Sequence, residues 1–372
     1  MSEGQKITVN IRVLNTYLII ALVVVSLLLA YKLYWQKPAP ATIPEAKKAQ
    51  LTVIVITPPK CDGCLPNTAF AEAVMQLPNV NVTEEYVGYN TTEGKALIEE
   101  YSLTRLPAAI VTGETEGLSL PGFHQKGKAH YFNETPPPYY STKEKRVVGR
   151  VSIIYITDST CPQCFDITQF GSQLKQAGVS IISEKNIDLS SADALVMIEN
   201  YGIKRIPTMI LSPEALEYRL LAEAWSEVGT QEANGMLVFR KTPPPYKGIP
   251  DNKVHGLVTI TYITDKSCLE CYNVSLHKEV LAQGFGMVFK AEKTIDISTK
   301  AGKDLIAKYG IKYVPTLLLD KEAGEYSQLP EAWAEVGSQD ADGTFVFRNV
   351  NNLVGITYKD LTTNMTNTTA AG

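Results

Sequence analysis

The chain contains 372 residues with a formal net charge of −4, and 45% of its residues are hydrophobic. That length is typical of two or three domains, and that composition is typical of a globular protein rather than a disordered one. The lysines and arginines are scattered without a long basic run, so nucleic acid is not an expected partner. The four histidines form no H-x-x-x-H pattern, and we expect neither a metal nor a cofactor.

The first feature in chain order is an apolar segment that follows a short N-terminal tail (1–12). Residues 13–31 are 19 uncharged residues bounded by Arg12 and Lys32. A helix of that length rises about 28 Å, roughly the thickness of the hydrocarbon core of a bilayer. Aromatic residues near its ends favour the membrane interface. The pattern predicts a transmembrane signal anchor over 13–35, through which the chain would bind a membrane.

Two signals orient the predicted anchor with its C-terminal side outside, although the flanking lysines lean slightly the other way. Large C-terminal domains translocate largely regardless of charge. The chain also carries more N-x-[ST] glycosylation sequons than chance predicts. They begin at Asn81, Asn90, Asn133, Asn273, Asn364 and Asn367. The predicted localisation is a single-pass membrane protein with extracellular or extracytoplasmic C-terminal domains, a compartment that permits disulfides.

Beyond this segment one pattern occurs three times. Each copy has a β-branched apolar run, a C-x-x-C pair, an amphipathic helical pattern and later an X-Pro that opens another apolar run. The pairs are Cys61/Cys64, Cys161/Cys164 and Cys268/Cys271, which use all six cysteines, and the prolines are Pro107, Pro207 and Pro315. From the second cysteine to its proline the chain advances 43 residues in two copies and 44 in the third.

Proline-rich stretches between the copies predict the domain boundaries. The predicted divisions are a Pro-rich linker at 36–49, domain 1 at 50–134, a linker at 135–147, domain 2 at 148–241, a linker at 242–254, domain 3 at 255–349 and a polar tail at 350–372. We expect the tail to be disordered or glycosylated. Within a copy the predicted order is β-α-β-α-β-β, which is a mixed α/β arrangement.

The strand–C-x-x-C–helix opening and the stretches YGIKRIPTMIL (201–211) and YGIKYVPTLLL (309–319) resemble the thioredoxin superfamily. The resemblance covers nearly all of residues 50–348, and the plan is similar to that of protein disulfide isomerases. It implies α/β architecture with three tandem thioredoxin-like domains, each a mixed central sheet flanked by helices, after one transmembrane helix. It also implies a cis peptide before each proline of the pattern. The residues before these prolines (Leu106, Ile206 and Val314) would offer their backbone to an extended substrate.

The chain departs from the superfamily pattern in the residues that precede each cysteine pair. The superfamily's Trp immediately before the first cysteine is absent. The buried acid that lies six residues before the first cysteine is absent too, and Val55, Tyr155 and Tyr262 stand there. This removes the acid that the superfamily uses to deprotonate the resolving thiol.

The residues around the cysteines rank the three pairs for exchange chemistry. Cys161 is the predicted attacking thiolate, because a helix N-terminus stabilises negative charge. Cys164, predicted to be more buried, would resolve the mixed disulfide. Asp62 and Glu270 each neighbour a cysteine of another pair, and a nearby carboxylate raises a thiol pKa. The pattern therefore ranks the middle pair first, the first pair second and the third pair as a structural disulfide.

Three alternatives to catalysis remain open. All three pairs can be permanent disulfides, although loops this short stabilise a fold only modestly. Zinc bound by two pairs, or an iron–sulfur cluster, is disfavoured because neighbouring pairs lie about 100 residues apart in the sequence and head separate domains.

The leading functional prediction is a membrane-anchored thiol–disulfide oxidoreductase or isomerase. Its partners would be the thiols and disulfides of secreted or surface proteins, together with a membrane redox partner or complex. The alternative is a non-enzymatic binding or scaffold subunit of a membrane or cell-surface complex, whose C-x-x-C disulfides are structural.

Overall fold

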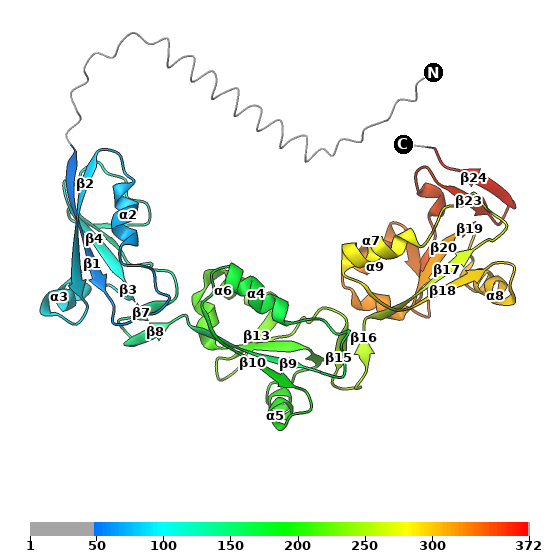
Figure 1. The fold of residues 1–372 in the computed structure, drawn as a ribbon, viewed down its shortest axis with the longest axis horizontal. Coiled ribbons are helices and arrows are strands. Elements are labelled where there is room, and N and C mark those ends of the chain that lie inside the picture. The colour runs from blue at the N-terminus through cyan, green and yellow to red at the C-terminus, as the bar shows by residue number, and fades with distance from the viewer. Residues whose placement is uncertain (1–47, 371–372) are drawn as a thin grey trace, which may run out of the picture.

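The computed structural model describes residues 48–370 and contains three successive units of mixed α/β structure (Figure 1). Unit 1 comprises residues 49–148, unit 2 residues 151–255 and unit 3 residues 257–368. Each unit has one five-stranded sheet and one separate three-stranded sheet. This repeated sheet-plus-helix architecture fits tandem thioredoxin-like domains.

The elements of unit 1 are β1 (Ala49–Thr57), α2 (Ala69–Met75), β2 (Val80–Gly88), α3 (Thr92–Glu100), β3 (Arg105–Leu106), β4 (Ala108–Gly113), β5 (His124–Lys126), β6 (Ala129–Phe132), β7 (Tyr139–Ser141) and β8 (Arg146–Val148). Those of unit 2 are β9 (Val151–Thr157), α4 (Thr168–Gln176), β10 (Ile181–Asp188), α5 (Ala192–Asn200), β11 (Arg205–Ile206), β12 (Thr208–Leu211), η1 (Pro213–Glu217), α6 (Arg219–Val228), β13 (Gly229–Gln231), β14 (Leu237–Phe239), β15 (Tyr246–Gly248) and β16 (Val254–His255). Those of unit 3 are β17 (Leu257–Thr264), α7 (Leu276–Phe285), β18 (Val288–Asp296), α8 (Lys300–Tyr309), β19 (Tyr313–Val314), β20 (Thr316–Leu319), η2 (Lys321–Glu325), α9 (Leu329–Ala334), β21 (Gly337–Gln339), β22 (Phe345–Phe347), η3 (Val350–Asn352), β23 (Thr357–Asp360) and β24 (Met365–Thr368).

The five-stranded sheets share one topology. The strand order is β2-β1-β4-β6-β5 in unit 1, and the corresponding strands of units 2 and 3 follow the same order. The first two strands of each unit are parallel, as the helix between them requires, and the remaining neighbours are antiparallel. The interior strand β1 therefore ends beside the start of β4, where Ile56 pairs with Ala108.

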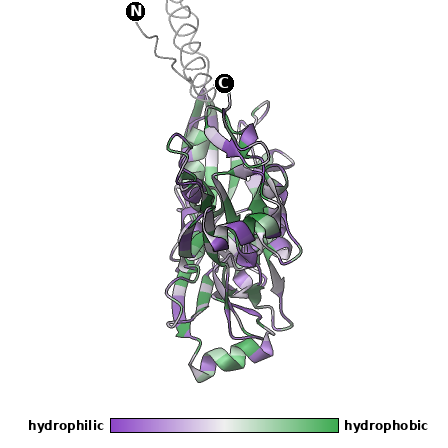
Figure 2. Cartoon of the chain, turned by 90° about the vertical axis from the view of Figure 1, so that its right-hand side faces the viewer, coloured by the Kyte–Doolittle hydropathy of each residue, from purple (hydrophilic) through white to green (hydrophobic). Residues whose placement is uncertain are grey.

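Apolar side chains cover both faces of each sheet. In unit 2 one buried cluster includes Ile153 and Trp225, and the cluster on the other face includes Ile156 and Ile198. β9 supplies alternate residues to the two clusters because successive side chains of a strand point to opposite faces. In Figure 2 hydrophobic positions (green) alternate with hydrophilic ones (purple) along strands and helices. This burial explains the β-branched runs of the sequence.

The three-stranded sheets lie where the sequence predicts proline-rich linkers and a polar tail. In unit 1, β7 and β8 form a hairpin that pairs with β3. The equivalent hairpin of unit 2 is β15–β16, which pairs with β11. That of unit 3 is β23–β24, which pairs with β19. We call these segments the closing hairpins. Residues 357–368 are thus ordered strands, contrary to the expectation of a disordered tail.

An aromatic–ionic contact recurs at the two junctions between units. Tyr139 of the first closing hairpin donates a 2.6 Å hydrogen bond to Glu217 of unit 2, and Arg105 lies over the Tyr139 ring with its guanidinium carbon 4.4 Å from the centroid. At the second junction Tyr246 donates to Glu325 of unit 3 over the same distance, and Arg205 covers its ring. Each junction therefore joins a closing hairpin to the 3-10 helix of the next unit.

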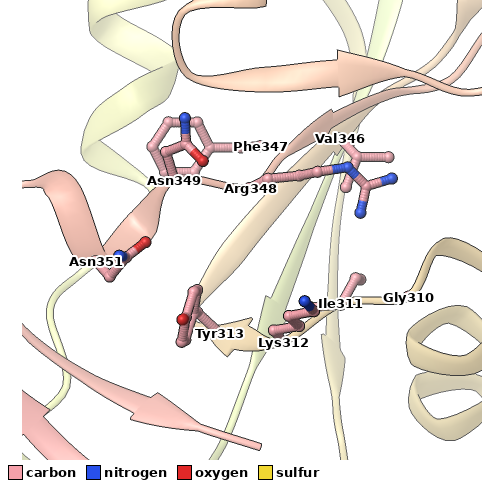
Figure 3. A pocket seen from close by; sticks show the side chains of 9 residues that line it. All are labelled: Gly310, Ile311, Lys312, Tyr313, Val346, Phe347, Arg348, Asn349 and Asn351. Carbon is pink, nitrogen blue, oxygen red and sulfur yellow. The ribbon is translucent and has the colours of Figure 1, made fainter. Parts of the chain in front are cut away.

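Unit 3 has a corresponding surface, and within residues 48–370 no further unit packs against it. Here Tyr313 takes the place of the arginine and packs edge-on against Tyr358, with ring centroids 5.3 Å apart. An open pocket of about 440 Å³ lies beside it, lined in part by Lys312, Arg348 and Asn351 (Figure 3). The corresponding pockets at the junctions are lined by residues of both units that meet there.

The predicted transmembrane segment (13–35) lies outside the described residues. Between residues 48 and 370 no helix is long and apolar enough to cross a membrane. This finding contradicts the localisation predicted from the sequence, a single-pass membrane protein with extracellular or extracytoplasmic domains, and that prediction is withdrawn.

We expect the first junction to resist alkaline pH. Burial and the bond to Glu217 raise the pKa of Tyr139 to about 12, although Arg105 opposes the shift. A phenol whose pKa is raised on folding stabilises the folded form below its ordinary value of about 10, and the contribution is lost as pH rises through the folded value. The difference in tyrosinate absorbance between the wild type and Tyr139→Phe should show one phenol titrating near pH 12. A phenol that titrates with the exposed tyrosines would contradict this contact.

Candidate functional site

Each cysteine pair lies on a turn just beyond the first strand of its unit. The three pairs form disulfides with Cα–Cα distances of 5.5, 5.4 and 5.4 Å, so the described residues contain no free cysteine. In each turn the second cysteine N–H donates to the first cysteine carbonyl, as Cys164 does to Cys161 over 3.1 Å. The three turns therefore share one local geometry.

The turns are not helix N-termini. α4 begins at Thr168, seven residues after Cys161, and α2 and α7 begin eight residues after Cys61 and Cys268. The prediction that Cys161 opens a helix is therefore wrong, and the helix dipole does not reach its sulfur, because the dipole acts only within the first turn.

Burial within the middle pair is also opposite to the prediction. Cys161 is 8% exposed and counts among the buried core residues, whereas Cys164 is partly exposed. The other four cysteines are partly exposed as well. An incoming thiolate must reach a sulfur atom. The pair ranked first from local charge contains the one cysteine of the six that is buried.

The prolines facing the pairs have the geometry that the superfamily resemblance implies. The Leu106–Pro107, Ile206–Pro207 and Val314–Pro315 peptides are all cis. The sheet register places each proline beside the end of the strand that leads into the cysteine turn. Their carbonyls are satisfied by hydroxyl donors, which are Thr135, Thr242 (2.7 Å) and Tyr272 (3.1 Å) in chain order. Tyr272 directly follows Cys271 and so ties the turn of unit 3 to its cis-proline.

The backbone edge expected to receive a substrate is filled by the chain itself. Leu106 pairs with Tyr140, Ile206 with Lys247, and Val314 with Lys359 of the closing hairpins. An extended peptide that adds to a sheet edge uses the same backbone groups. In this structure the edge is therefore not open to a substrate strand.

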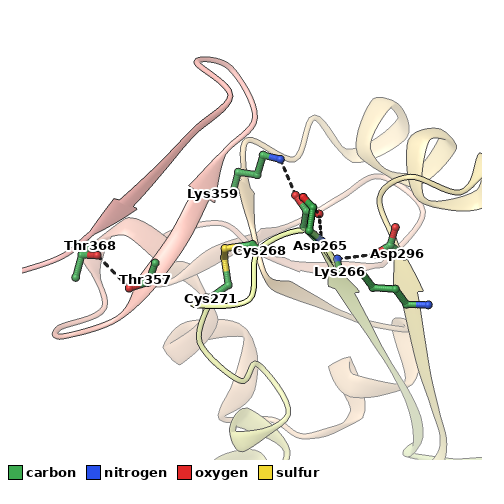
Figure 4. Close-up of a disulfide and its surroundings, with 9 residues drawn as sticks. Asp265, Lys266, Cys268, Cys271, Asp296, Thr357, Lys359 and Thr368 are labelled. Carbon is green, nitrogen blue, oxygen red and sulfur yellow. Dashed lines mark hydrogen bonds and ion pairs between the residues drawn. A yellow bond between two sulfur atoms is a disulfide. The ribbon is translucent and has the colours of Figure 1, made fainter.

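Sequence reasoning missed a buried ion pair beside two of the disulfides. Lys247 Nζ lies 2.8 Å from Asp158 Oδ2, and these side chains are 16% and 4% exposed. Lys359 Nζ lies 2.7 Å from Asp265 Oδ2, with 18% and 6% exposed (Figure 4). The shared I-T-D sequence three residues before the first cysteine of units 2 and 3 was the available signal.

The acids of these pairs are held ionised. Burial raises the pKa of the Asp158 carboxyl, but the ion pair with Lys247 and the hydrogen bonds from Thr160 outweigh burial, so its pKa lies below the ordinary value. The same balance, with Lys359 and Ser267 as donors, lowers the pKa of Asp265. Each carboxylate is thus a permanent negative charge at neutral pH. The backbone carbonyl of each aspartate accepts a 3.0 Å hydrogen bond from the N–H of the first cysteine in the same turn.

Unit 1 lacks this ion pair. Pro58 stands at the position of the acid, and Tyr140 stands at the position of the lysine. The Tyr140 ring packs against Tyr89 with centroids 5.1 Å apart. At this position the first closing hairpin is therefore held by a contact between two tyrosines, where the other two hairpins are held by an ion pair.

The side chain of one predicted glycosylation site, Asn133, forms hydrogen bonds with the backbone of its own unit. Asn133 accepts a 2.7 Å bond from the Thr104 N–H, and its side-chain nitrogen donates to the Ser102 carbonyl over 3.3 Å. The side-chain nitrogen that glycosylation would modify is therefore engaged. Of the other sequon residues, Asn81, Asn90, Asn273 and Asn364 are exposed and Asn367 is partly buried. Their glycosylation stays a prediction.

Residues 48–370 contain no cluster of metal-ligating side chains. No group of three or more His, Cys, Asp or Glu side chains there could hold an ion. The cysteines of the zinc and iron–sulfur alternatives are instead joined within their own turns.

Comparison with known proteins gives only distant likenesses. No family model and no curated protein matches the chain. A structure of ERdj5 (form II) is 14% identical over 77% of this chain, which spans 40% of that protein, with a TM-score of 0.14. Human ERp44 (form II) is 9% identical over 84% of this chain and 100% of its own length, with a TM-score of 0.14.

The NTD_N/C domain of alkylhydroperoxide reductase AhpF from Enterococcus faecalis is 17% identical over 46% of this chain and 83% of that domain, with a TM-score of 0.13. At these identities and TM-scores the likenesses carry no argument about activity or partners.

We expect Lys359→Met to destabilise unit 3 by about 3–5 kcal/mol near neutral pH, because it leaves the buried Asp265 without its cation. An acid whose pKa is lowered on folding contributes stability above its ordinary pKa, and the contribution is lost as pH falls through the lower folded value. The defect should therefore shrink in acid. Denaturant-dependent hydrogen exchange of unit 3 peptides measures it.

Lys278→Met is the matched control, because Lys278 pairs with Glu292 on the surface of the same unit. It should cost less than about 1 kcal/mol. Equal losses of unfolding free energy in the two variants would show that the buried Lys359–Asp265 pair stabilises unit 3 no more than a surface ion pair does.

Proposed function

We propose that this protein is a thiol–disulfide oxidoreductase that acts on cysteines of other proteins. The observation that carries the proposal is the repeated position of a four-residue disulfide turn beside the strand end next to a cis-proline. In the chain-entropy model such a short loop contributes only about 2 kcal/mol. Stabilisation is therefore a weak reason for one chain to carry three such pairs, whereas exchange needs two cysteines this close.

The exchange reaction balances without any further cofactor. A substrate thiolate attacks one sulfur of the protein disulfide, forms a mixed disulfide and releases the other cysteine as a thiolate, which takes up a proton. A second substrate thiolate then attacks the substrate sulfur of the mixed disulfide. The substrate is released with a new disulfide bond. The second protein cysteine is released as a thiolate and takes up a proton, so the protein pair is now a dithiol. The reverse sequence reduces a substrate disulfide.

A scaffold function is the second candidate, and the closing hairpins favour it. The same strands that fill the substrate edges also carry Tyr139 and Tyr246, which join successive units. A chain that keeps these contacts permanently would present three rigidly connected units to a partner. In that case the disulfides would be inert.

The test is disulfide exchange by the complete chain with a reduced dithiol protein as substrate. We expect oxidation of the substrate matched mole for mole by protein dithiol. Replacing both cysteines of every pair by serine should abolish it. Activity that persists in the serine variant would overturn the proposal, because it could not come from these pairs.

The reduction potential of each pair separates the two candidates. Exchange-active pairs should titrate at potentials like those of known oxidoreductases, about −270 to −120 mV. If all three pairs remain oxidised well below about −300 mV, the scaffold function is correct. Alkylation of each cysteine after equilibration with a redox buffer gives the three values separately.

A further inference from the structure

The closing hairpins contact the disulfide turns on both sides in units 2 and 3. In unit 2 the hairpin residue Lys247 pairs with Asp158, three residues before Cys161. On the other side the N–H of Phe165, which follows Cys164, donates to the Pro245 carbonyl over 2.7 Å. The turn is therefore fixed to the hairpin before and after its two cysteines.

Unit 3 repeats this arrangement with different residues. Lys359 pairs with Asp265, and the N–H of Tyr272 donates to the Thr357 carbonyl over 2.9 Å. Figure 4 shows the Cys268–Cys271 disulfide beside the hairpin strand from which Lys359 extends. The two hairpins thus make the same kind of contact with the turn, although one follows a Pro-Pro-Pro run and the other follows residues 349–356, which contain no proline.

Opening a hairpin separates the ion pair together with the strand pairing. Lys247 lies directly opposite Ile206, the residue before the cis-proline. A substrate strand at that edge must displace Lys247 and leave the buried Asp158 without its cation. Unit 1 lacks that ion pair, because Pro58 and Tyr140 cannot form one. Its cysteine turn is bound instead by a 2.9 Å hydrogen bond from the Arg150 guanidinium, just after the first closing hairpin, to the Asp62 carbonyl.

We propose that Lys247 and Lys359 are positioning residues that latch the closing hairpins of units 2 and 3 over their disulfides. Incoming thiols therefore reach the Cys61–Cys64 pair of unit 1 first. The inference deepens the proposed function and rests on it for its biological meaning. The order of access is reversed from the order that local charge predicts, in which Cys161 and Cys164 rank first.

The latch is tested with a small reductant, so the outcome does not depend on any protein substrate. The complete oxidised chain is treated with a limiting phosphine reductant, quenched with an alkylating agent and digested, and each pair is followed by mass spectrometry. We expect Cys61–Cys64 to be reduced about tenfold faster than the other pairs, because local opening limits their access.

Lys247→Met should speed reduction of Cys161–Cys164 about tenfold and leave the other two pairs unchanged. Lys247→Arg keeps the charge and should restore slow reduction. Lys241→Met is the matched control, because Lys241 is an exposed lysine of the same segment. Lys359→Met should act in the same way on Cys268–Cys271 alone.

A double variant, Asp158→Asn with Lys247→Met, separates a latch from simple unfolding. It removes the buried charge that destabilises the single variant, so the unit stays folded while the latch is absent. Fast reduction in the double variant supports the latch. Slow reduction in the double variant, or equal rates for all pairs in the wild type, overturns it. The latch pattern without exchange of a protein substrate would overturn the proposed function and leave the latch intact.

Discussion

Backbone pairing between the strand before each cis-proline and the closing hairpin is the interaction on which the rest of the structure depends. Those strands are only two residues long, and the second residue of each is buried, so its N–H and C=O groups must be paired. The hairpin supplies the partners in all three units. In units 2 and 3 the hairpin residue opposite the pre-proline position pairs with the acid beside the cysteine turn. In units 1 and 2 the residue before that position contacts the next unit.

One short strand therefore serves two contacts at once. In unit 1 Leu106 pairs with Tyr140, while the adjacent Arg105 stacks on Tyr139 at the junction. Unit 2 repeats the same pair of contacts one unit further along. A movement of the hairpin away from the disulfide would disturb the junction as well. Access to a disulfide and the orientation of the next unit are thus physically connected.

The two candidate functions differ in whether this connection opens. A permanently closed hairpin gives a rigid chain of three units with protected disulfides, whereas a hairpin that opens exposes a sheet edge and an exchange site together. The physical difference between the units lies in what holds each hairpin. Charge at Asp158 and Asp265 resists opening more strongly than the aromatic packing of Tyr140, because a separated buried charge must be solvated again.

The sequence by itself determined the three-fold repeat and the strand–helix–strand–helix start of each unit, and the family resemblance implied the cis peptides before Pro107, Pro207 and Pro315. The repeat and the succession of elements follow from periodicity and spacing within short windows, which local backbone preferences control. Only the tertiary structure decided that α4 begins well past Cys161, that the Pro-rich segments form hairpins, and that Lys359 reaches Asp265 from 94 residues away. Contacts at that separation depend on how the sheet folds back on itself, and no local pattern encodes them.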